Sequence, residues 1–227
     1  MIISDRLRSI ASMVDKVDTL VDIGTDHAYL PIYLALNGIV KRVYAIDNKI
    51  GPLNNATKNI KNSGLENIII PLLSDGLKDA KDIKYDAINI SGMGSETIID
   101  ILSIDNLDEN ATLILEPQKN PDLLRKYLMD KNYEIVDELF IKDKEHYYPI
   151  IKAKKTTKVI NYNNLEILFG PIILKKKDPL FIEFINKQIN ALEEGLPKAK
   201  NKDNLEAKIN LLKEVLKSWN YIILSKN

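Results

Sequence analysis

The sequence predicts an α/β domain built on a largely parallel sheet, followed by a helical hairpin. Two observations support this prediction. Along the first 155 residues, short runs rich in Ile and Val alternate with helix-length segments, which is typical of a parallel sheet covered by helices. From Asp178 onwards, apolar residues recur every three or four positions, as they do in amphipathic helices. The 227 residues suffice for one such domain with a helical appendage.

The first five strand-like segments are separated by stretches long enough for helices, so we expect them to be parallel in the sheet. These strands are expected at Thr19–Ile23, Arg42–Ile46, Ile68–Leu72, Tyr85–Ile90 and Thr112–Leu115. The helices are expected at Tyr29–Asn37, Pro52–Asn62, Ser95–Leu102 and Pro121–Asp130.

Two further strand-like segments, Tyr133–Ile141 and Tyr147–Ala153, are joined only by residues 142–146. This connection is too short for a crossover helix, so we expect an antiparallel hairpin. Strand-helix units followed by such a hairpin give the outline of a Rossmann-like class I methyltransferase sheet of seven strands. Other Rossmann-like enzymes share the pattern, so the outline does not define the function.

The character of the sequence changes after Lys155, where a polar, Asn-rich stretch begins. We therefore expect one domain over residues 1–155, and a linker with a C-terminal helical hairpin over residues 156–227. Gly195 and Pro197 separate the two expected helices. Whether this coiled-coil-like hairpin packs on the main domain or protrudes from it stays open. The helical spacing is carried by Ile182, Ile185, Ile189, Leu192, Leu205, Ile209, Leu212, Leu216 and Trp219.

The composition excludes several classes of protein. The chain has no cysteine, so disulfide scaffolds, thiol catalysis, Fe–S clusters and Cys-ligated zinc are excluded, and only His27 and His146 offer imidazole ligands. We therefore expect no metal. Asp5, Arg6 and Arg8 lie where a signal peptide needs an apolar core, and no apolar run approaches the roughly 18 residues of a membrane span. We expect a cytoplasmic protein without a membrane partner; its oligomeric state stays open, with a monomer favoured.

The charge balance argues against a nucleic-acid partner only while the chain is treated as a whole. The 32 basic and 32 acidic residues cancel. Residues 1–155 carry 20 basic and 24 acidic residues, a net charge of −4, whereas residues 156–227 carry 12 and 8, a net charge of +4. Lysines at 175–177, 198, 200 and 202 supply local positive charge that either binds phosphate or forms a solvated surface. Any RNA contact must therefore be local.

The loop after the first strand has the sequence Asp22-Ile-Gly-Thr-Asp-His-Ala-Tyr. In open α/β sheets, ligands bind beyond the carboxyl ends of the strands, and Gly24 allows the close approach of a ligand there. Asp26 occupies the position of the second glycine of a dinucleotide-binding turn, where a carboxylate would repel a pyrophosphate. The loop therefore disfavours NAD and FAD, and it tolerates a cofactor with a sulfonium cation and no phosphate.

The loops after the next three strands add residues that suit the same cofactor. Asp47 follows the second strand, at the spacing of an acid that binds ribose hydroxyls. Asp75 and Gly76 follow the third strand, where a carboxylate can accept a hydrogen bond from an adenine amino group. Gly92 and Met93 follow the fourth and offer room and an apolar wall. Each acid has a plain alternative as a helix cap or turn residue. Together these residues favour S-adenosyl-L-methionine.

On these residues, the sequence resembles the bacterial tRNA (adenine-N1)-methyltransferases that modify adenine 22, and the resemblance spans nearly the whole chain. Asp22 to Pro31 is its most specific part. Two departures are visible: Ser91 and Ser95 replace an expected Ala and Gly, and Glu116-Pro-Gln118 replaces an expected Gln-Pro-Asn. The change to Glu116 replaces a donor and an acceptor by an acceptor-only carboxylate. The matching segments are Arg6-Leu7, Ile10-Ala11, Asp22 to Pro31, Gly51-Pro-Leu, Ala56, Asn59-Ile60, Asp75-Gly76-Leu77, Gly92-Met93-Gly94 and Phe169-Gly-Pro.

The resemblance implies a class I methyltransferase domain with a coiled-coil-like C-terminal domain, which transfers a methyl group from S-adenosyl-L-methionine to N1 of an adenine in tRNA. We expect Asp26 to accept a hydrogen bond from the adenine amino group, His27 to orient it or relay its proton, and Tyr29 to contact the base. A helix cap, a loop histidine and a core tyrosine are the plain alternatives. The residues expected to bind the cofactor are Arg6, Asp22, Gly24, Thr25, Asp47, Asn48, Asp75, Gly76, Gly92 and Met93.

Other functions stay open at this point. The same cofactor residues would serve a methyltransferase that acts on another RNA, a protein or a small molecule. A protein that keeps the fold and binds RNA without catalysis is a second class, which the intact set of acids and glycines argues against. A nicotinamide-dependent oxidoreductase is disfavoured by Asp26.

Overall fold

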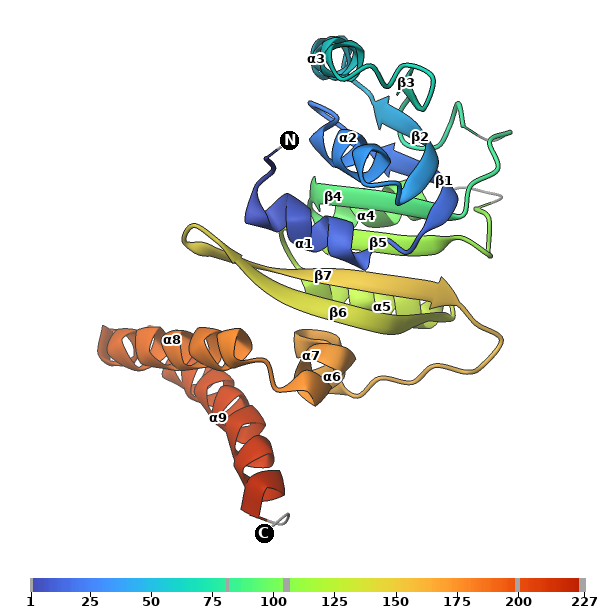
Figure 1. The fold of residues 1–227 in the computed structure, drawn as a ribbon. Helices are drawn as coiled ribbons and strands as arrows, with labels where there is room; N and C mark the ends of the chain where they lie inside the picture. Colours follow the sequence, from blue (N-terminus) through green and yellow to red (C-terminus); the bar gives the residue numbers. More distant parts are fainter. Residues whose placement is uncertain (1, 81, 104–106, 199–200, 225–227) are drawn as a thin grey trace. The chain divides into compact units, whose positions relative to one another are not determined.

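The computed structural model describes residues 2–80, 82–103, 107–198 and 201–224. The chain divides into two compact units, Met1–Ile172 and Ile173–Asn227 (Figure 1). The division lies later than the boundary expected after Lys155, because the following segment bonds to the first unit. Thr156 N donates to Asn132 O at 3.0 Å, and the Tyr162 hydroxyl accepts from Ile135 N at 2.8 Å.

The described residues of the first unit form the expected seven-stranded sheet, in the order β3-β2-β1-β4-β5-β7-β6 (Figure 1). β1 to β5 are parallel, whereas β7 runs antiparallel to both β5 and β6. The class I methyltransferase sheet and its terminal hairpin are thereby confirmed. The strands are β1 Val17–Ile23, β2 Val40–Asp47, β3 Ile69–Leu73, β4 Ala87–Met93, β5 Thr112–Pro117, β6 Tyr133–Asp143 and β7 His146–Lys155.

Helices cover both faces of the sheet, and alternate strand residues supply the two cores. On β1, Leu20 packs with residues of α1, α2 and α3, whereas its neighbour Val21 packs with residues of α4 and α5. This alternation follows from the two-residue period of a strand. The helices of this unit are α1 Asp5–Met13, α2 Tyr29–Leu36, α3 Ile50–Asn62, α4 Ser95–Leu102, α5 Pro121–Asp130, α6 Asn164–Phe169 and the first two residues of α7, Pro171–Lys176.

Three of these helices were not expected from the sequence, and each is short. α1 begins at the N-cap Ser4, whose side chain accepts from Leu7 N, and it buries Ile10 and Ala11. α6 begins with a capping box, in which Asn163 and Glu166 each bond to the other's backbone N–H. Such caps are visible in a sequence, whereas α6 and α7, with six residues each, have too few turns for a clear apolar period.

The order of the strands reverses beside β1, since β2 lies on one side of it and β4 on the other. Such a switch point opens a crevice at the carboxyl ends of the strands. The β4–β5 ladder also shifts register between Ser91 and Met93, with Ser91 opposite Glu116. This irregularity turns the end of β4 where the crevice begins.

The second unit contains α8 Pro179–Gly195, the 3-10 turn Leu196–Lys198 and α9 Lys202–Leu224. Phe181, near the start of α8, packs on Trp219 of α9 with ring centroids 5.9 Å apart, so the two helices run antiparallel. Ile185, Ile209 and Leu212 are buried between them. The expected helical hairpin is confirmed, with its turn at Gly195 and Pro197. Among the described residues, no helix combines the length and apolarity that a bilayer crossing requires.

Candidate active site

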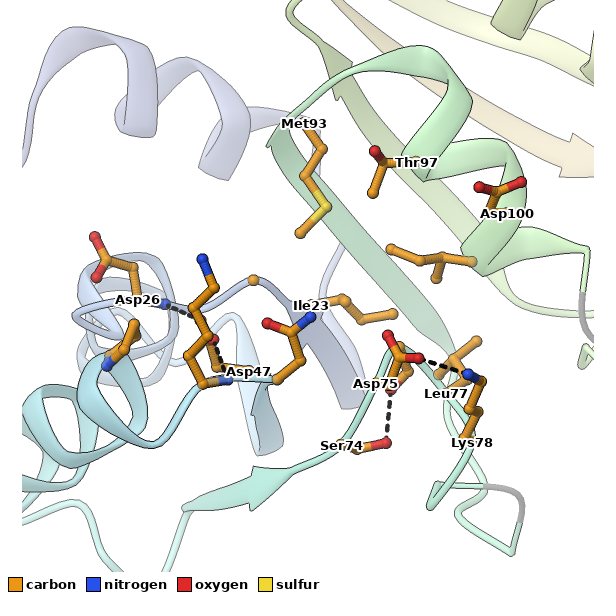
Figure 2. A pocket seen from close by; sticks show the side chains of 16 residues that line it. Ile23, Asp26, Asp47, Ser74, Asp75, Leu77, Lys78, Met93, Thr97 and Asp100 are labelled. Carbon is orange, nitrogen blue, oxygen red and sulfur yellow. Dashed lines mark hydrogen bonds and ion pairs between the residues drawn. The ribbon is translucent and has the colours of Figure 1, made fainter.

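A cavity of about 600 Å³ lies at the carboxyl ends of β1, β2 and β3 and is bounded by α4 (Figure 2). Carboxylates from separate loops reach it, and Met93 enters from the end of β4 (Figure 2). The crevice predicted from strand order is therefore the place where the predicted acids meet. Its lining is Ile23, Gly24, Asp26, Asp47, Asn48, Lys49, Pro52, Ser74, Asp75, Gly76, Leu77, Lys78, Met93, Thr97, Asp100 and Ile101.

Gly24 is required at the floor of this cavity. Its φ of +78° lies in the region that favours glycine, and a Cβ built there would collide with Cε of Met93. The Met93 side chain therefore lies directly over the Gly24 backbone. Main-chain atoms of Gly24 and the flexible thioether of Met93 therefore form one continuous part of the cavity lining.

Asp47 is held in place by backbone donors. Its carboxylate is largely buried and accepts hydrogen bonds from Lys49 N at 3.0 Å and from Asp26 N at 3.3 Å. The first residue of α3 follows Lys49, and no side chain caps that helix. Asp47 therefore stabilises two loops instead of a helix end, and these bonds fix its carboxylate at the edge of the cavity (Figure 2).

Asp75 is more exposed and bonds to a lysine. Lys78 Nζ lies 2.5 Å from its Oδ2, and this hydrogen bond, with the attraction between the charges, lowers the pKa of Asp75. The neighbouring Gly76 has a φ of +62°, and Ile101 packs 3.3 Å from the position of a Cβ there. Backbone and side chain together shape a slot between the loop after β3 and α4.

One face of α4 also lines this cavity and was missed in the sequence. Thr97, Asp100 and Ile101 are three and four residues apart, so they lie on the same side of the helix. The usable signal was their position in the helix that directly follows Gly92 and Gly94. Lys49, Pro52 and Ser74 were missed as well, although they adjoin predicted residues.

A second cavity, of about 310 Å³, shares Gly24 and Asp26 with the first. It lies between α1, the loop after β1 and the ends of β4 and β5, and it is more polar in its composition. Together the two cavities are lined by all the residues predicted for cofactor and catalysis. The lining of the second is Arg6, Leu7, Asp22, Gly24, Thr25, Asp26, His27, Tyr29, Leu30, Asn89, Ser91, Gly92 and Gln118.

Asp22 forms the start of a buried polar chain in the second cavity. Asn89 Nδ2 donates to its Oδ1 at 2.7 Å, and Ser91 Oγ donates to Asn89 Oδ1 at 2.8 Å. Burial raises the pKa of Asp22 to about 6; the adjacent side chains of Thr25 and Asn89 oppose this rise, and the Asp47 charge adds to it. Near neutral pH the carboxylate is thus close to its titration range, and it responds to charge brought into the cavity.

The loop from Thr25 to Tyr29 has an unusual backbone. Asp26 and Ala28 have φ values of +48° and +55°, which are uncommon for residues other than glycine. The loop is held by Ala28 N, which donates to Thr25 O at 2.8 Å, and by Asn59 Nδ2, which donates to His27 O at 3.0 Å. This conformation directs the Asp26 and His27 side chains outward into the opening.

The three predicted catalytic side chains are accessible and adjacent. The Asp26 and His27 side chains are 65% and 41% exposed, with His27 Nε2 3.6 Å from Asp26 Oδ2, and Tyr29 is 43% exposed. The rings of His27 and Tyr29 stack with centroids 5.2 Å apart. α2 has no side-chain cap, so Asp26 does not cap it, and Tyr29 is not a core residue. Their catalytic roles stay predictions.

Arg6 and Glu116 form a fork in the wall of the second cavity. Arg6 Nη2 and Nε lie 2.8 Å and 3.3 Å from the two carboxylate oxygens of Glu116, and Gly92 N donates to the same carboxylate at 2.7 Å. Arg6, which was expected to bind the cofactor, is therefore already paired with a side chain. Among the described residues, no group of three or more acidic, His or Cys side chains is placed to hold a metal ion.

Comparison with known proteins agrees with this geometry. Residues 3–151 match the family model described as "Methyltransferase domain". The chain is 30% identical to the tRNA (adenine(22)-N(1))-methyltransferase of Bacillus subtilis (strain 168), over 94% of this chain and 97% of that protein. M. capricolum TrmK in complex with S-adenosyl-homocysteine superposes with a TM-score of 0.85 at 33% identity, over 96% of this chain and 99% of that one.

The Streptococcus pneumoniae putative tRNA (m1A22) methyltransferase in complex with S-adenosyl-L-methionine superposes with a TM-score of 0.84 at 33% identity, over 95% of this chain and 100% of that one. Sheet order, acid-lined crevice and similarity over nearly the whole length all agree. The chain therefore belongs to the tRNA (adenine(22)-N(1))-methyltransferase family of class I, S-adenosyl-L-methionine-dependent methyltransferases.

Proposed function

We propose that this protein transfers a methyl group from S-adenosyl-L-methionine to N1 of adenine 22 in tRNA. The observation that carries the proposal is the pair of cavities that share Gly24 and Asp26. The larger, acid-lined cavity has the volume and polarity of a nucleoside-binding site, and the smaller one opens beside Asp26, His27 and Tyr29. A methyl donor and an acceptor base in these cavities would meet at the shared residues.

The larger cavity fits the adenosine part of the cofactor. The fixed carboxylate of Asp47 suits the two ribose hydroxyls, and Asp75 suits the adenine amino group. Asn48 and Gly76 adjoin these acids. A phosphate-bearing cofactor would be repelled by the negatively charged carboxylates of Asp26 and Asp47. These features favour S-adenosyl-L-methionine, which supplies a methyl group on a cationic sulfur.

The smaller cavity suits the methionine part and the acceptor base. Asp22 and Thr25 present polar groups for an ammonium, Gly92 leaves space beside the backbone, and Met93 contributes an apolar wall at the junction. Arg6 has donors to offer a carboxylate, although Glu116 occupies part of its guanidinium. We assign these residues to the cofactor end that carries the methyl group.

The residues around the acceptor base act mainly by positioning. N1 of neutral adenine carries an in-plane lone pair and needs alignment with the methyl group and the exclusion of water. As N1 is alkylated, positive charge develops on the ring, and the exposed Asp26 carboxylate is placed to accept a hydrogen bond from the amino group and stabilise that charge. His27 and Tyr29, already stacked, offer a ring surface and a polar edge to the base.

N1 lies on the Watson–Crick edge, so a base-paired adenine must be unpaired or turned out of its helix before it reacts. Recognition then depends on the shape and phosphates of tRNA more than on a long sequence. Lys175 to Lys177 are candidates for phosphate contacts, since the C-terminal part of the chain carries the excess of positive charge. Lys198 and Lys200 lie outside the described side chains, and Lys202 begins α9. A tRNA substrate would place the protein in the cytoplasm.

The decisive experiment combines the purified protein, labelled S-adenosyl-L-methionine and a single tRNA transcript. We expect one methyl group per tRNA, mapped by mass spectrometry to N1 of adenine 22. A transcript with guanine at position 22 is the matched control and should accept no label. A tRNA without label, or label at another nucleotide, would contradict the proposal and favour one of the alternative functions.

A further inference from the structure

Glu116 is a fully buried carboxylate that borders the smaller cavity. It lies at the end of β5, and it has 0% exposure. Its Oε2 accepts from both Arg6 Nη2 and Gly92 N, while its Oε1 accepts from Arg6 Nε. Arg6 comes from α1, 110 residues away in the chain, and both Arg6 and Gly92 line the cavity. One buried acid thus holds two parts of the cavity wall.

This arrangement uses both oxygens of the Glu116 carboxylate. A glutamine at the same place has one acceptor oxygen, and its amide NH2 would face a guanidinium donor. The hydrogen bond from Gly92 N to Glu116 stabilises the irregularity in β4. The β4–β5 ladder shifts register at Gly92, and Glu116 accepts the N–H of that residue. In a glutamine at position 116, the amide oxygen can still accept the hydrogen bond from Gly92 N. The lost negative charge therefore affects mainly Arg6.

The positive charge of Arg6 is compensated by the negative charge of Glu116. Burial lowers the pKa of Arg6 and the hydrogen bond to Glu116 raises it; the balance is a raised pKa, so Arg6 is a permanent cation at the cavity wall. Asp143 and Tyr148 also raise this pKa by charge, without a hydrogen bond to Arg6 among those of the described residues. Without Glu116, the positive charge of the Arg6 guanidinium would lose its paired carboxylate and would face the smaller cavity.

We propose that Glu116 is a positioning residue that neutralises and orients Arg6, which keeps this wall of the cavity free of net positive charge where the cationic sulfonium and the methylated base are held. The inference rests on the proposed function for the location of these two cations. Both repel an uncompensated guanidinium, whereas Asp22 and Asp26 in the same lining attract them. Arg6 can thus donate hydrogen bonds without opposing the charge that develops in the reaction.

The test compares the cationic cofactor with its neutral product. In Glu116→Gln, we expect the dissociation constant of S-adenosyl-L-methionine, measured by calorimetry, to rise at least about fivefold relative to that of S-adenosyl-homocysteine. In the double variant Arg6→Gln/Glu116→Gln, which is again neutral, the ratio of the two constants should return to within about twofold of the parent.

The chain offers a matched control in a second buried pair, in which Arg125 Nε lies 2.9 Å from Glu138 Oε1. Glu138→Gln makes the same chemical change away from both cavities, so it should lower the melting temperature and leave the ratio of the dissociation constants unchanged. A shift in this control as large as that of Glu116→Gln would mean that lost stability, not local charge, moves the ratio, and would overturn the inference.

An unchanged ratio in folded Glu116→Gln would also overturn it, as would a double variant no better than the single one. If Glu116→Gln does not fold, the variant Arg6→Gln provides the test. Because this variant lacks the cation, its dissociation constant for S-adenosyl-L-methionine must not rise relative to that for S-adenosyl-homocysteine. The ratio is measured without tRNA. If the variants show these shifts and the parent protein does not methylate tRNA, the proposed function is contradicted. The inference about Glu116 and the cationic cofactor then still holds.

Discussion

Asp26 combines two properties that rarely occur together in a residue with a side chain. Its backbone is left-handed, with a φ of +48°, and its carboxylate is exposed at the junction of both cavities. Strained backbone of this kind persists when the surroundings hold it, and here Asp47 accepts its N–H while Asn59 holds the next carbonyl. The loop therefore presents Asp26 by means of residues from two other elements.

We predict that Asp26→Asn lowers the turnover number on tRNA about 100-fold, because it removes the negative charge that stabilises the methylated base. Asparagine tolerates a positive φ, so the loop should keep its shape. The dissociation constant of S-adenosyl-homocysteine, measured by calorimetry, should stay within about twofold of the parent. Unchanged turnover would remove Asp26 from the mechanism.

Asp22 predicts a pH dependence of stability. Its pKa is about 6 in the folded protein and near 3.8 in an unfolded chain, so the folded state binds the proton more tightly. This group therefore stabilises the fold below pH 4, and its contribution, about 3 kcal/mol, is lost as the pH rises through 6. Urea unfolding of the parent and of Asp22→Asn at pH 4 and pH 7 should show this difference. Parallel pH curves for the two proteins would contradict it.

At the scale of elements, a buried pair holds the segment after the sheet. Arg125 of α5 pairs with Glu138 of β6, and its Nη1 donates to the carbonyls of Ile167 and Leu168 at the end of α6. Glu138 Oε2 also accepts from the N–H of Ile172 at 3.0 Å. The turn between α6 and α7 is thereby fixed to the sheet, which explains why the first unit extends to residue 172.

We predict that Gly170→Ala destabilises the protein by at least about 2 kcal/mol. The residue has a φ of +96°, and a Cβ would collide with the Glu138 carboxylate. Gly38→Ala is the matched control, because its φ is +63° and nothing lies within 4 Å of the Cβ position. That control should cost only about 1 kcal/mol. Equal losses in urea unfolding would show that the contact with Glu138 contributes nothing.

At the scale of the whole molecule, the neutral total charge conceals two oppositely charged parts of the sequence. The acids assigned to the cofactor belong to the first part, and Lys175 to Lys177 belong to the second. With 28 lysines and 4 arginines, phosphate contacts in this protein are mainly those of point charges. Such contacts depend strongly on salt.

We predict that replacing Lys175, Lys176 and Lys177 together by Ala weakens tRNA binding and lowers its salt dependence, by a slope of up to about 2 to 3 in a plot of log affinity against log salt concentration. Lys41→Ala is the control; Lys41 pairs with Asp18 at 2.7 Å, near the opposite ends of the strands from the cavities. Binding measured from 50 to 200 mM salt should separate the two. Equal affinities and slopes would exclude these lysines from the tRNA surface.

The sequence by itself determined the alternation of strands and helices, the terminal hairpin, and the acids and glycines that follow the strands. These features are local, because side-chain periodicity and turn residues act over a few positions. The shortest helices, α6 and α7, escaped prediction, since six residues carry little periodicity. Asp22, Gly24, Asp47 and Asp75 could be chosen because strand ends of a parallel sheet share one edge.

Only the tertiary structure decided which of these residues share a cavity and which neutralise each other. Arg6 was expected to bind the cofactor, and its partner Glu116 was visible only as a departure from a motif. Their contact depends on the order and register of β4 and β5 and on the placement of α1. Contacts between residues 110 positions apart arise from packing of whole elements, which local patterns do not encode.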